Sequence, residues 1–334
     1  MKKVTIETVA QRVGVSAATV SYALSGKKKI SPEVKAKIDE AIKELGYRPS
    51  ITARNLASNK NWTVGLFASP TGNIREDFFF NNILAGVLDT LHEKKYQLML
   101  YADYRSDTEQ DNPDFNFSQP IDGALVMNPR VNDSNIDQLK ERGIPYVLIG
   151  TSEDLSISYF VDSDITAGYY AAVKHLISKG HKKIYLLNGR ADYTQSEKRR
   201  IGYRQALIDS GIEYDENCIL NLAMLEEAGY TAVLEILAED PECTAVVTFN
   251  DTIALGVLKA LREHQIAVPG RMAVVSAGNT MITRIHSPSI TSIDMAPYAI
   301  GAKAAELLID VIEKRRMQPS HELLQAFLVE RESS

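Results

Sequence analysis

From residue 62 onward, short apolar runs alternate with longer stretches that have helical periodicity. The apolar runs occupy residues 63–68, 97–101, 123–127, 145–149, 184–187, 245–249 and 273–277. The helical stretches occupy residues 81–94, 134–142, 165–179, 196–210, 226–238, 251–264 and 296–314. Strands that alternate with helices in this way form parallel sheets with helices on both faces. About 270 residues of this pattern are too many for one sheet, so we expect an α/β fold with a two-lobed, doubly wound parallel-sheet core.

We expect the chain to cross between the two lobes near Asp162 and near Ser292. These crossings divide the core of residues 62–334 into two discontinuous lobes. The first lobe is predicted to contain residues 62–161 and about 293–320, and the second lobe residues 162–291 and about 322–331.

The charge of the chain is divided unevenly between its first sixty residues and the rest. Residues 1–61 contain 12 Lys and Arg but only 5 Asp and Glu, a net charge of +7, whereas the remainder carries −13. A basic segment in front of an acidic one indicates that the basic segment alone has a polyanionic partner. A solvated surface rich in charge is the alternative that this asymmetry by itself leaves open.

Three short helices are predicted within residues 1–48, and each begins at a hydroxyl residue and ends at a glycine. The start and end residues are Thr5 and Gly14, Ser16 and Gly26, and Ser31 and Gly46. Two helices joined by a tight Gly-Val-Ser turn and braced by a third form a helix-turn-helix. In that motif the second helix enters the major groove of DNA with its first residues nearest the bases. A helical hairpin packed against another part of the protein is the alternative.

The outward face of the second helix carries small and hydroxyl side chains, which let the backbone approach DNA closely. Alanine methyl groups can contact thymine methyls, and hydroxyls can reach phosphates or base edges. Lys27, Lys28, Lys29, Lys35 and Lys37 can supply charge for phosphates. The candidate DNA contacts in this domain are Thr5, Ser16, Ala17, Ala18, Thr19, Ser21, Tyr22, Lys29 and Ser31.

Residues 49–61 are predicted to form a hinge helix and linker, because Pro49 interrupts the chain and Ser50 can cap a short helix through Ser58. So short a helix is unstable alone and needs a partner. A leucine on such a helix can wedge between base pairs in a minor groove. The candidate DNA contacts here are Ser50, Ala53, Leu56 and Ala57. A plain linker is the alternative.

Residues 4–57 resemble the N-terminal region of the LacI/GalR (lactose-repressor/galactose-repressor) family of bacterial transcriptional regulators. The resemblance is carried by T-I-x-x-V-A-x-x-x-G-V-S-x-x-T-V-S, I-S-P-E-V and E-L-G-Y-R-P-S-x-x-A-R-x-L-A. It implies a homodimeric repressor that binds a near-palindromic double-stranded DNA operator, with Leu56 as the minor-groove wedge. Tyr22 departs from the family, in which this position is often an Arg that reads guanine.

The rest of the chain also resembles this family, whose core has the periplasmic-binding-protein fold. The matching segments include K-G-H-K-K-I-Y-L-L from residue 179, F-N-D-T-I-A-L-G-V-L-K-A-L from residue 249 and I-T-S-I-D-M-A-P-Y-A-I-G from residue 290. The resemblance implies a small-molecule effector, a sugar or sugar derivative, in the cleft between the lobes. Residues 101–120 are acidic and rich in turn-forming residues where the family has a helix, so we expect that helix to be shortened or lost.

Candidate effector contacts lie where ligands bind doubly wound sheets, beyond the carboxyl ends of the strands. This rule selects Ser69, Asp162, Asn250 and Asp251 from the residues alone. Arg199, Asn250 and Phe79 match family effector contacts. Each of three candidates has a purely structural alternative. Asp251 can cap a helix, Phe79 can belong to the core, and Arg199 can be one of a solvated basic run.

Two further departures from the family bear on the effector. Gly278 stands where the family often has an Asp that accepts hydrogen bonds from ligand hydroxyls. Met224 stands where an aromatic side chain often stacks on the ligand.

Catalytic and metal-binding motifs are missing from the sequence, which contains no GxxxxGK[ST], GxGxxG, HExxH or GxSxG. The 6 His are scattered without metal-ligand spacing, and the 2 Cys form no CxxC. We therefore expect no enzyme activity and no cofactor. The basic first segment and the absence of a signal peptide or membrane-length apolar run favour a cytoplasmic protein. The alternatives are a periplasmic-type sugar-binding protein without a DNA role and a sugar-modifying enzyme.

Overall fold

The computed structural model describes residues 4–25, 28–47, 60–68, 77–102, 120–129, 133–151, 157–191 and 193–334. The chain forms two compact units, Met1–Trp62 and Thr63–Ser334. We call the described residues 4–47 the head and the second unit the body. Among the described residues, no helix is long and apolar enough to cross a membrane, and no group of three metal-ligating side chains gathers.

The head contains the three predicted helices, α1 (Ile6–Val13), α2 (Ala17–Ser25) and α3 (Pro32–Leu45). Gly14 ends α1 in a left-handed conformation with φ 75°, which glycine adopts without strain. The hydroxyl of Ser31 accepts a hydrogen bond from the amide of Val34 and begins α3. Buried side chains from all three helices meet in one small core, made of Val9, Ala10, Val20, Ile38, Ala41 and Tyr47.

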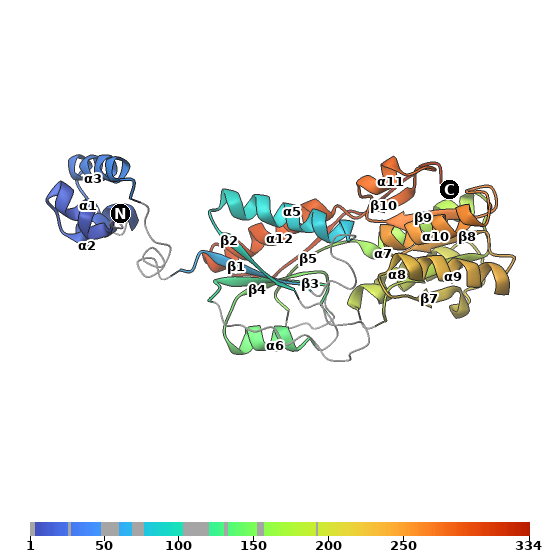
Figure 1. Ribbon diagram of the computed structural model, residues 1–334. Coiled ribbons are helices and arrows are strands. Elements are labelled where there is room, and N and C mark those ends of the chain that lie inside the picture. The colour runs from blue at the N-terminus through green and yellow to red at the C-terminus, as the bar shows by residue number, and fades with distance from the viewer. Residues whose placement is uncertain are drawn as a thin grey trace. The chain divides into compact units, whose positions relative to one another are not determined.

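The body contains two six-stranded sheets, which confirms the α/β fold class with two doubly wound lobes (Figure 1). The first sheet has the order β11-β5-β4-β3-β1-β2, and all its neighbouring strands are parallel. Its strands are β1 (Thr63–Ala68), β2 (Gln97–Ala102), β3 (Gly123–Met127), β4 (Tyr146–Ile149), β5 (Tyr159–Ser163) and β11 (Ser320–Leu324). Helices α5 (Phe78–Glu93) and α12 (Pro297–Ile312) cover one face, and α6 (Ser134–Glu141) covers the other.

The second sheet has the order β12-β10-β9-β8-β6-β7, in which only the β10–β12 pair is antiparallel. Its strands are β6 (Ile184–Asn188), β7 (Ile219–Asn221), β8 (Ala245–Thr248), β9 (Ala273–Ala277), β10 (Thr291–Asp294) and β12 (Phe327–Val329). The helices of this lobe are α7 (Ile165–Ser178), α8 (Thr194–Ile208), α9 (Glu226–Glu239), α10 (Asp251–Glu263) and the short α11 (Met281–Ile285). A 3-10 turn covers Glu216–Cys218.

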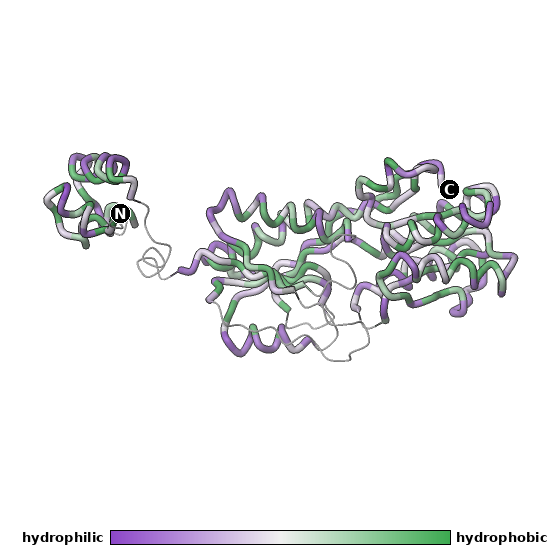
Figure 2. The backbone as a smooth tube through the Cα atoms, in the orientation of Figure 1, coloured by the Kyte–Doolittle hydropathy of each residue, from purple (hydrophilic) through white to green (hydrophobic). Residues whose placement is uncertain are grey.

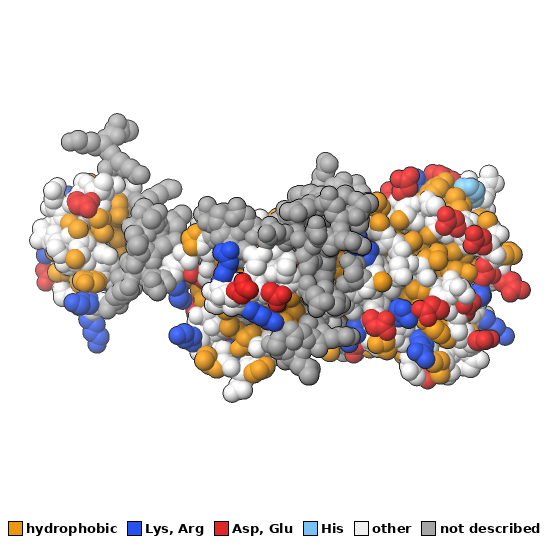
Figure 3. All heavy atoms as spheres, turned by 90° about the horizontal axis from the view of Figure 1, so that it is seen from below, with side chains coloured by type: hydrophobic (Ala, Val, Ile, Leu, Met, Phe, Trp, Pro, Cys, Tyr) orange, Lys and Arg blue, Asp and Glu red, His pale blue; other side chains and the backbone are white. Residues whose placement is uncertain are grey.

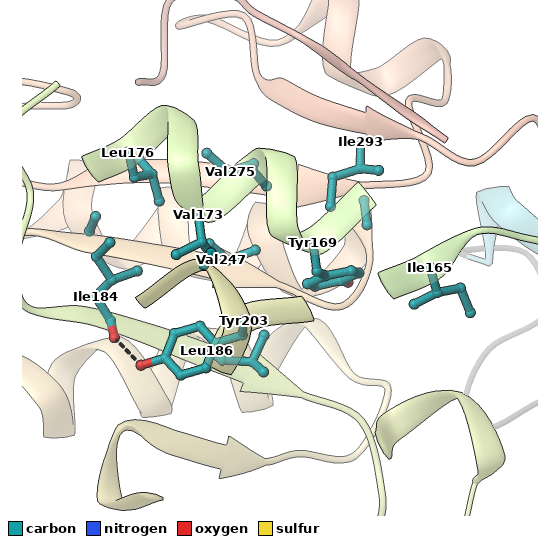
Figure 4. Close-up of a cluster of buried hydrophobic side chains, with 14 of the residues drawn as sticks. Ile165, Tyr169, Val173, Leu176, Ile184, Leu186, Tyr203, Val247, Val275 and Ile293 are labelled. Carbon is teal, nitrogen blue, oxygen red and sulfur yellow. Dashed lines mark hydrogen bonds between the residues drawn. The ribbon is translucent and has the colours of Figure 1, made fainter. Parts of the chain in front are cut away.

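Hydrophobic side chains are concentrated in the central strands of both sheets, whereas outer helices such as α6 are largely hydrophilic (Figure 2). In the second lobe, α7 and α8 form one apolar layer against the sheet, and α9 and α10 form another on its opposite face. The first layer is shown in Figure 4, where the hydroxyl of Tyr203 donates a hydrogen bond to the carbonyl of Ile184 at 2.9 Å. This bond satisfies the one polar group of a fully buried ring.

Three segments of chain connect the lobes: β5 to α7, β10 to α12, and β11 to β12. The hydroxyl of Ser163 in the first segment donates to the carbonyl of Met295 in the second. The predicted boundaries between the lobes, at residues 161/162, 291/293 and 320/322, fall inside strands. β5 continues through Ser163, β10 through Asp294 and β11 through Leu324. None of these three strands was among the predicted apolar runs, because each contains polar residues within its span.

Candidate functional site

The N-terminal end of α2 is built by hydrogen bonds among its hydroxyl side chains. The Oγ of Ser16 accepts from the amide of Thr19 at 3.1 Å, and the two hydroxyls lie 2.9 Å apart. Ser16 and Ala18 are exposed, Ala17 and Ser21 are half-buried, and Val20 is fully buried against the other helices. The core therefore anchors one side of α2 and leaves a surface of small and hydroxyl side chains on the other.

The remaining candidate DNA contacts of the head are distributed around α2. The amide of Thr5 donates to the Oγ1 of Thr8 at 3.2 Å at the start of α1, and Lys29 and Ser31 are exposed between α2 and α3. Tyr22 is half-buried, and the Nζ of Lys28 lies over its ring, 5.1 Å from the ring centroid. Lys28 is thus already engaged by an aromatic face.

Two observations change the predicted surface of the head. Lys37, predicted to supply charge for phosphates, pairs with Glu33 one helical turn away at 2.9 Å. Leu24, in the last turn of α2, adds an apolar side chain that is 41% exposed. Lys27, Ser50, Ala53, Leu56, Ala57, Ser69 and most of the acidic stretch 101–120 lie outside the described residues.

A cleft lies between the two lobes of the body, and its empty space, including the part that is open to solvent, is about 800 Å³. The first lobe contributes Asp77 and Phe79 from the start of α5 and Met127 and Asn128 from the end of β3. The second lobe contributes most of the remaining wall. Its lining residues include Tyr169, Arg190, Tyr193, Gln195, Arg199, Met224, Phe249 and Asn250. Half of the side chains named here are aromatic or apolar and half are polar or charged, so the cleft offers both apolar surface and groups that can orient a ligand.

Arg199 occupies a fixed position in the wall of the cleft. Its Nη1 donates to the Oδ1 of Asn188 and to the Oγ of Ser196, both at 3.3 Å. Its guanidinium carbon lies 5.4 Å from the centroid of the Phe249 ring. Gly189 provides the space, because a Cβ there would stand 3.3 Å from Nη1. The guanidinium is therefore oriented in advance, which lowers the entropic cost of binding a ligand.

Asp162 lies at the base of the cleft near the end of β5 and is only 3% exposed. Its Oδ1 accepts from the amide of Ser163 at 2.8 Å, whereas its Oδ2 has no hydrogen-bond partner among the described residues. Burial raises the pKa of Asp162 to about 7, against smaller lowering effects of the Ser163 amide, Gln195 and Arg199. The Oδ2 atom of Asp162 can therefore accept a hydrogen bond from a ligand in the cleft.

The adjacent residues Asn250 and Asp251 have different roles. Asn250 lines the cleft and caps α10, since its Oδ1 accepts from the amide of Ile253 at 2.9 Å. Asp251 is buried and is not among the cleft-lining residues. Its carboxylate accepts from the hydroxyl and amide of Thr280 and from the hydroxyls of Ser276 and Ser292. These bonds hold Asp251 in the fold and favour a structural role for it, while its role as an effector contact stays a prediction.

Phe79 lines the cleft and also packs against the apolar core of the second lobe. Its two interpretations, ligand contact and core residue, are thus compatible. Met224 lines the cleft as well, so a flexible thioether takes the place of the aromatic side chain expected from the family.

Sequence reasoning missed several cleft residues that come directly after strands. Asn128 follows β3, and Gly189 and Arg190 follow β6. The rule that selected Asn250 would have found all three, had it been applied to every strand. Asp77, which is half-buried and whose pKa is raised by desolvation, was missed because α5 begins three residues earlier than predicted.

Comparison with known families divides the chain in the same way. Residues 5–50 match the family described as bacterial regulatory proteins, lacI family. Residues 173–334 match the periplasmic binding protein-like domain.

Curated relatives align with nearly the whole chain. Catabolite control protein A of Priestia megaterium is 31% identical over 319 residues, which cover 95% of each protein. The HTH-type transcriptional regulator CelR of Thermobifida fusca is 32% identical over 338 residues and covers 99% of this chain and 98% of its own length.

Solved structures show the same architecture. The transcriptional regulator CelR in complex with cellobiose superposes with a TM-score of 0.74 at 31% identity, over 99% of this chain and 100% of that one. The lac repressor dimer bound to operator and an anti-inducer has a TM-score of 0.84 and covers 99% of both chains. Its 21% identity supports the shared fold alone.

Proposed function

Because this chain belongs to the LacI family of bacterial regulatory proteins, we propose that it is a homodimeric repressor controlled by a carbohydrate effector. That it is a DNA-binding transcriptional regulator follows from the family and from relatives that cover almost its entire length. The sign of regulation, the class of effector and the residues that contact DNA and effector are the finer parts of the proposal.

The head contacts DNA through the N-terminal part of α2 and the residue before it. The proposed contacts are Ser16, Ala17, Ala18, Thr19 and Ser21, of which Ser16 and Ala18 are exposed and the others half-buried. This surface is supported by two of the described features. Val20 anchors the helix from behind, and no Glu, Asp or long aliphatic side chain obstructs the first two turns. The net charge of +7 on residues 1–61 attracts the phosphate backbone and makes binding strongly dependent on salt.

The carbohydrate assignment is carried by one observation: polar groups and aromatic faces converge in the cleft. Arg199 presents an oriented guanidinium, Asp162 has an acceptor oxygen with no partner among the described residues, and Asn250 retains its amide NH₂ as a donor. Phe79 and Phe249 provide apolar faces on which a sugar ring can pack. The similar regulator CelR was solved with cellobiose, which makes β-linked disaccharides the first ligands to test.

The dimer is supported by an apolar surface on the second lobe. Met281 and Ile285 are one helical turn apart on α11, and their side chains are 64% and 66% exposed. Exposed apolar side chains on one face of a helix are typical of a protein contact. A second copy of the chain is the proposed partner, as in the lac repressor dimer.

The effector proposal can be tested by a thermal-shift screen of sugars and phosphosugars, beginning with cellobiose. We expect a saturable rise in the melting temperature of the wild-type protein and no rise for Arg199→Ala. Arg200→Ala is the matched control, because Arg200 pairs with Glu197 and Glu216 outside the cleft and its loss should leave the response intact. If no sugar stabilises the wild-type protein, the carbohydrate assignment is wrong.

The DNA proposal can be tested by selection from a random duplex library, followed by titration of the selected duplex with and without the stabilising sugar. Enrichment of a near-palindromic sequence is expected, and the sugar should change the affinity for it. If no duplex is preferred over random competitor, the regulator does not read DNA as proposed.

A further inference from the structure

An ammonium group and an aromatic ring form a pair at the C-terminal end of α2 in the head. The Nζ of Lys28 lies over the ring of Tyr22, 5.1 Å from its centroid. At this distance the positive charge is attracted by the negative face of the ring. Lys28 comes from the segment after α2, so the contact joins the last turn of the helix to the chain that leaves it.

Tyr22 shares its side of α2 with the residues proposed to face DNA. It follows Ala18 by four residues, and side chains with this spacing lie on the same face of a helix. Ala18 is exposed and Tyr22 is half-buried, so the ring borders the surface that enters the groove.

We propose that Lys28 is a positioning residue for base recognition, which holds the Tyr22 ring against the DNA-facing surface of α2. Together the Tyr22 ring and the Lys28 ammonium provide a planar contact and a positive charge. The Arg that the family often has at position 22 combines both properties in one guanidinium. This role rests on the proposed DNA-binding function and specifies how part of the sequence preference arises.

The contact should become stronger when DNA binds. Exposed cation–π pairs are weak, and they gain strength when water is removed from around the charge. A groove that encloses Tyr22 and Lys28 removes that water. The coupling between the two residues should therefore be visible in affinity for the preferred duplex and much smaller for random DNA.

Lys29 provides an internal comparison because it is adjacent to Lys28, exposed and equally charged. A lysine that contacts only phosphates weakens binding to all sequences alike when it is replaced, whereas a residue involved in base recognition changes the preference at particular positions. The two lysines should therefore behave differently.

The test uses full-length protein and a random duplex library, with the variants Tyr22→Leu, Lys28→Met, the double variant, and Lys29→Met as control. We expect Lys28→Met to alter preference at the same base positions as Tyr22→Leu. The double variant should bind the wild-type duplex about fivefold more tightly than the product of the single losses predicts. Lys28→Arg and Tyr22→Phe, which keep a cation and a ring, should preserve the wild-type preference.

Two results would overturn this role. In the first, Lys28→Met lowers affinity for all duplexes alike, as Lys29→Met does, and its effect adds to that of Tyr22→Leu. In the second, the preference changes in Lys28→Arg as much as in Lys28→Met. Both results differ from failure of the proposed function itself. In that case the wild-type protein enriches no sequence, and the proposed role of Lys28 is wrong as well.

Discussion

The carboxylate of Asp251 occupies the space in which a side chain at Gly278 would begin. A Cβ at Gly278 would stand 3.0 Å from the Oδ2 of Asp251, and the glycine has φ +127°, which other residues rarely adopt. The family often has an Asp where this chain has Gly278. Here the space is filled from α10 by Asp251, which binds the Thr280 segment and Ser292 instead of a ligand.

Gly278→Ala should lower the free energy of unfolding by roughly 1–3 kcal/mol, because it forces an L-residue into a left-handed conformation beside a buried carboxylate. Gly278→Asp should lower it further, since two carboxylates would then compete for the same hydroxyl donors. Denaturant unfolding measures both. Gly270→Ala is the control, because Gly270 has no positive φ and its nearest neighbour would be 3.5 Å from a new Cβ. Wild-type stability in Gly278→Asp would contradict this account.

Effector affinity should depend on pH through Asp162. A ligand hydroxyl that donates to its Oδ2 favours the ionised carboxylate, whereas burial raises the pKa of the ligand-free group to about 7. Affinity should therefore rise as the pH increases towards about 7 and level off above it, with proton release on binding at the lower pH values.

Calorimetric titration with the stabilising sugar, in buffers of different ionisation enthalpy, measures this release. Asp162→Asn should bind without proton release. A carboxyl group whose pKa is raised on folding makes the folded state less stable as the pH rises from about 4 to about 7. The free energy of unfolding of the wild-type protein should therefore fall over this pH range, and that part of the fall should be missing in Asp162→Asn. An unchanged pH profile in Asp162→Asn would assign the titration to another group.

Replacing Ile285 with Asp should dissociate the proposed dimer without unfolding the protomer, because the side chain is 66% exposed. Sedimentation velocity of the wild-type protein should show a dimer, and the variant should shift to a monomer at the same concentration. Met317→Asp is the control, since Met317 is 73% exposed and lies after α12, away from α11 in the chain. If Ile285→Asp remains a dimer, the dimer interface does not include this surface of α11.

The contact between α5 and α12 depends on Gly301. A Cβ at Gly301 would lie 2.1 Å from the carbonyl oxygen of Ile83, so an added methyl group must push two helices apart. Gly301→Ala should therefore lower the free energy of unfolding by about 2–4 kcal/mol. Glu306→Ala on the exposed side of α12 should have little effect. Equal melting temperatures for the two variants would show that the helices adjust without cost.

All seven strands predicted from apolar runs are present in the structure, and four of them differ from the prediction by one residue at one end. Residues 63–68, 123–127 and 273–277 match β1, β3 and β9 residue for residue, since each is buried on both faces and reads as a continuous hydrophobic run. β10 was missed because its sequence, Thr-Ser-Ile-Asp, resembles a loop. Its first two residues are nevertheless fully buried, and Thr291 binds the hydroxyl of Ser333 through its amide. Such a strand is specified by distant partners.

Some cleft residues could likewise be predicted from their neighbours in the sequence, whereas others depend on residues far away in the chain. Asn250 could be located from its place after a strand, Asp162 from its place at the predicted crossing between the lobes, and Arg199 and Phe79 from the resemblance. The separation of Asn250 from Asp251 could not be inferred, because either carboxamide or carboxylate can cap a helix. What distinguishes them is the position of Ser276, Thr280 and Ser292, which lie 25 to 41 residues away.

The uneven charge of the sequence can be compared with the distribution of charged side chains on the surface of the body. On the face of the body in Figure 3, acidic and basic side chains of the second lobe are interspersed with apolar ones and form no single basic patch. The described part of the body therefore shows no extended surface of positive charge on that face, in contrast to the net charge of residues 1–61.

The arrangement of β11 and β12 has a consequence for biosynthesis. β11 pairs with β5 at one edge of the first sheet, and β12 pairs with β10 at one edge of the second. A nascent chain that has not yet emerged beyond Ser320 thus exposes two unsatisfied strand edges, one in each half-made lobe, and such edges promote aggregation. Because both strands lie within residues 320–329, the two sheets gain their last strands at nearly the same point of synthesis.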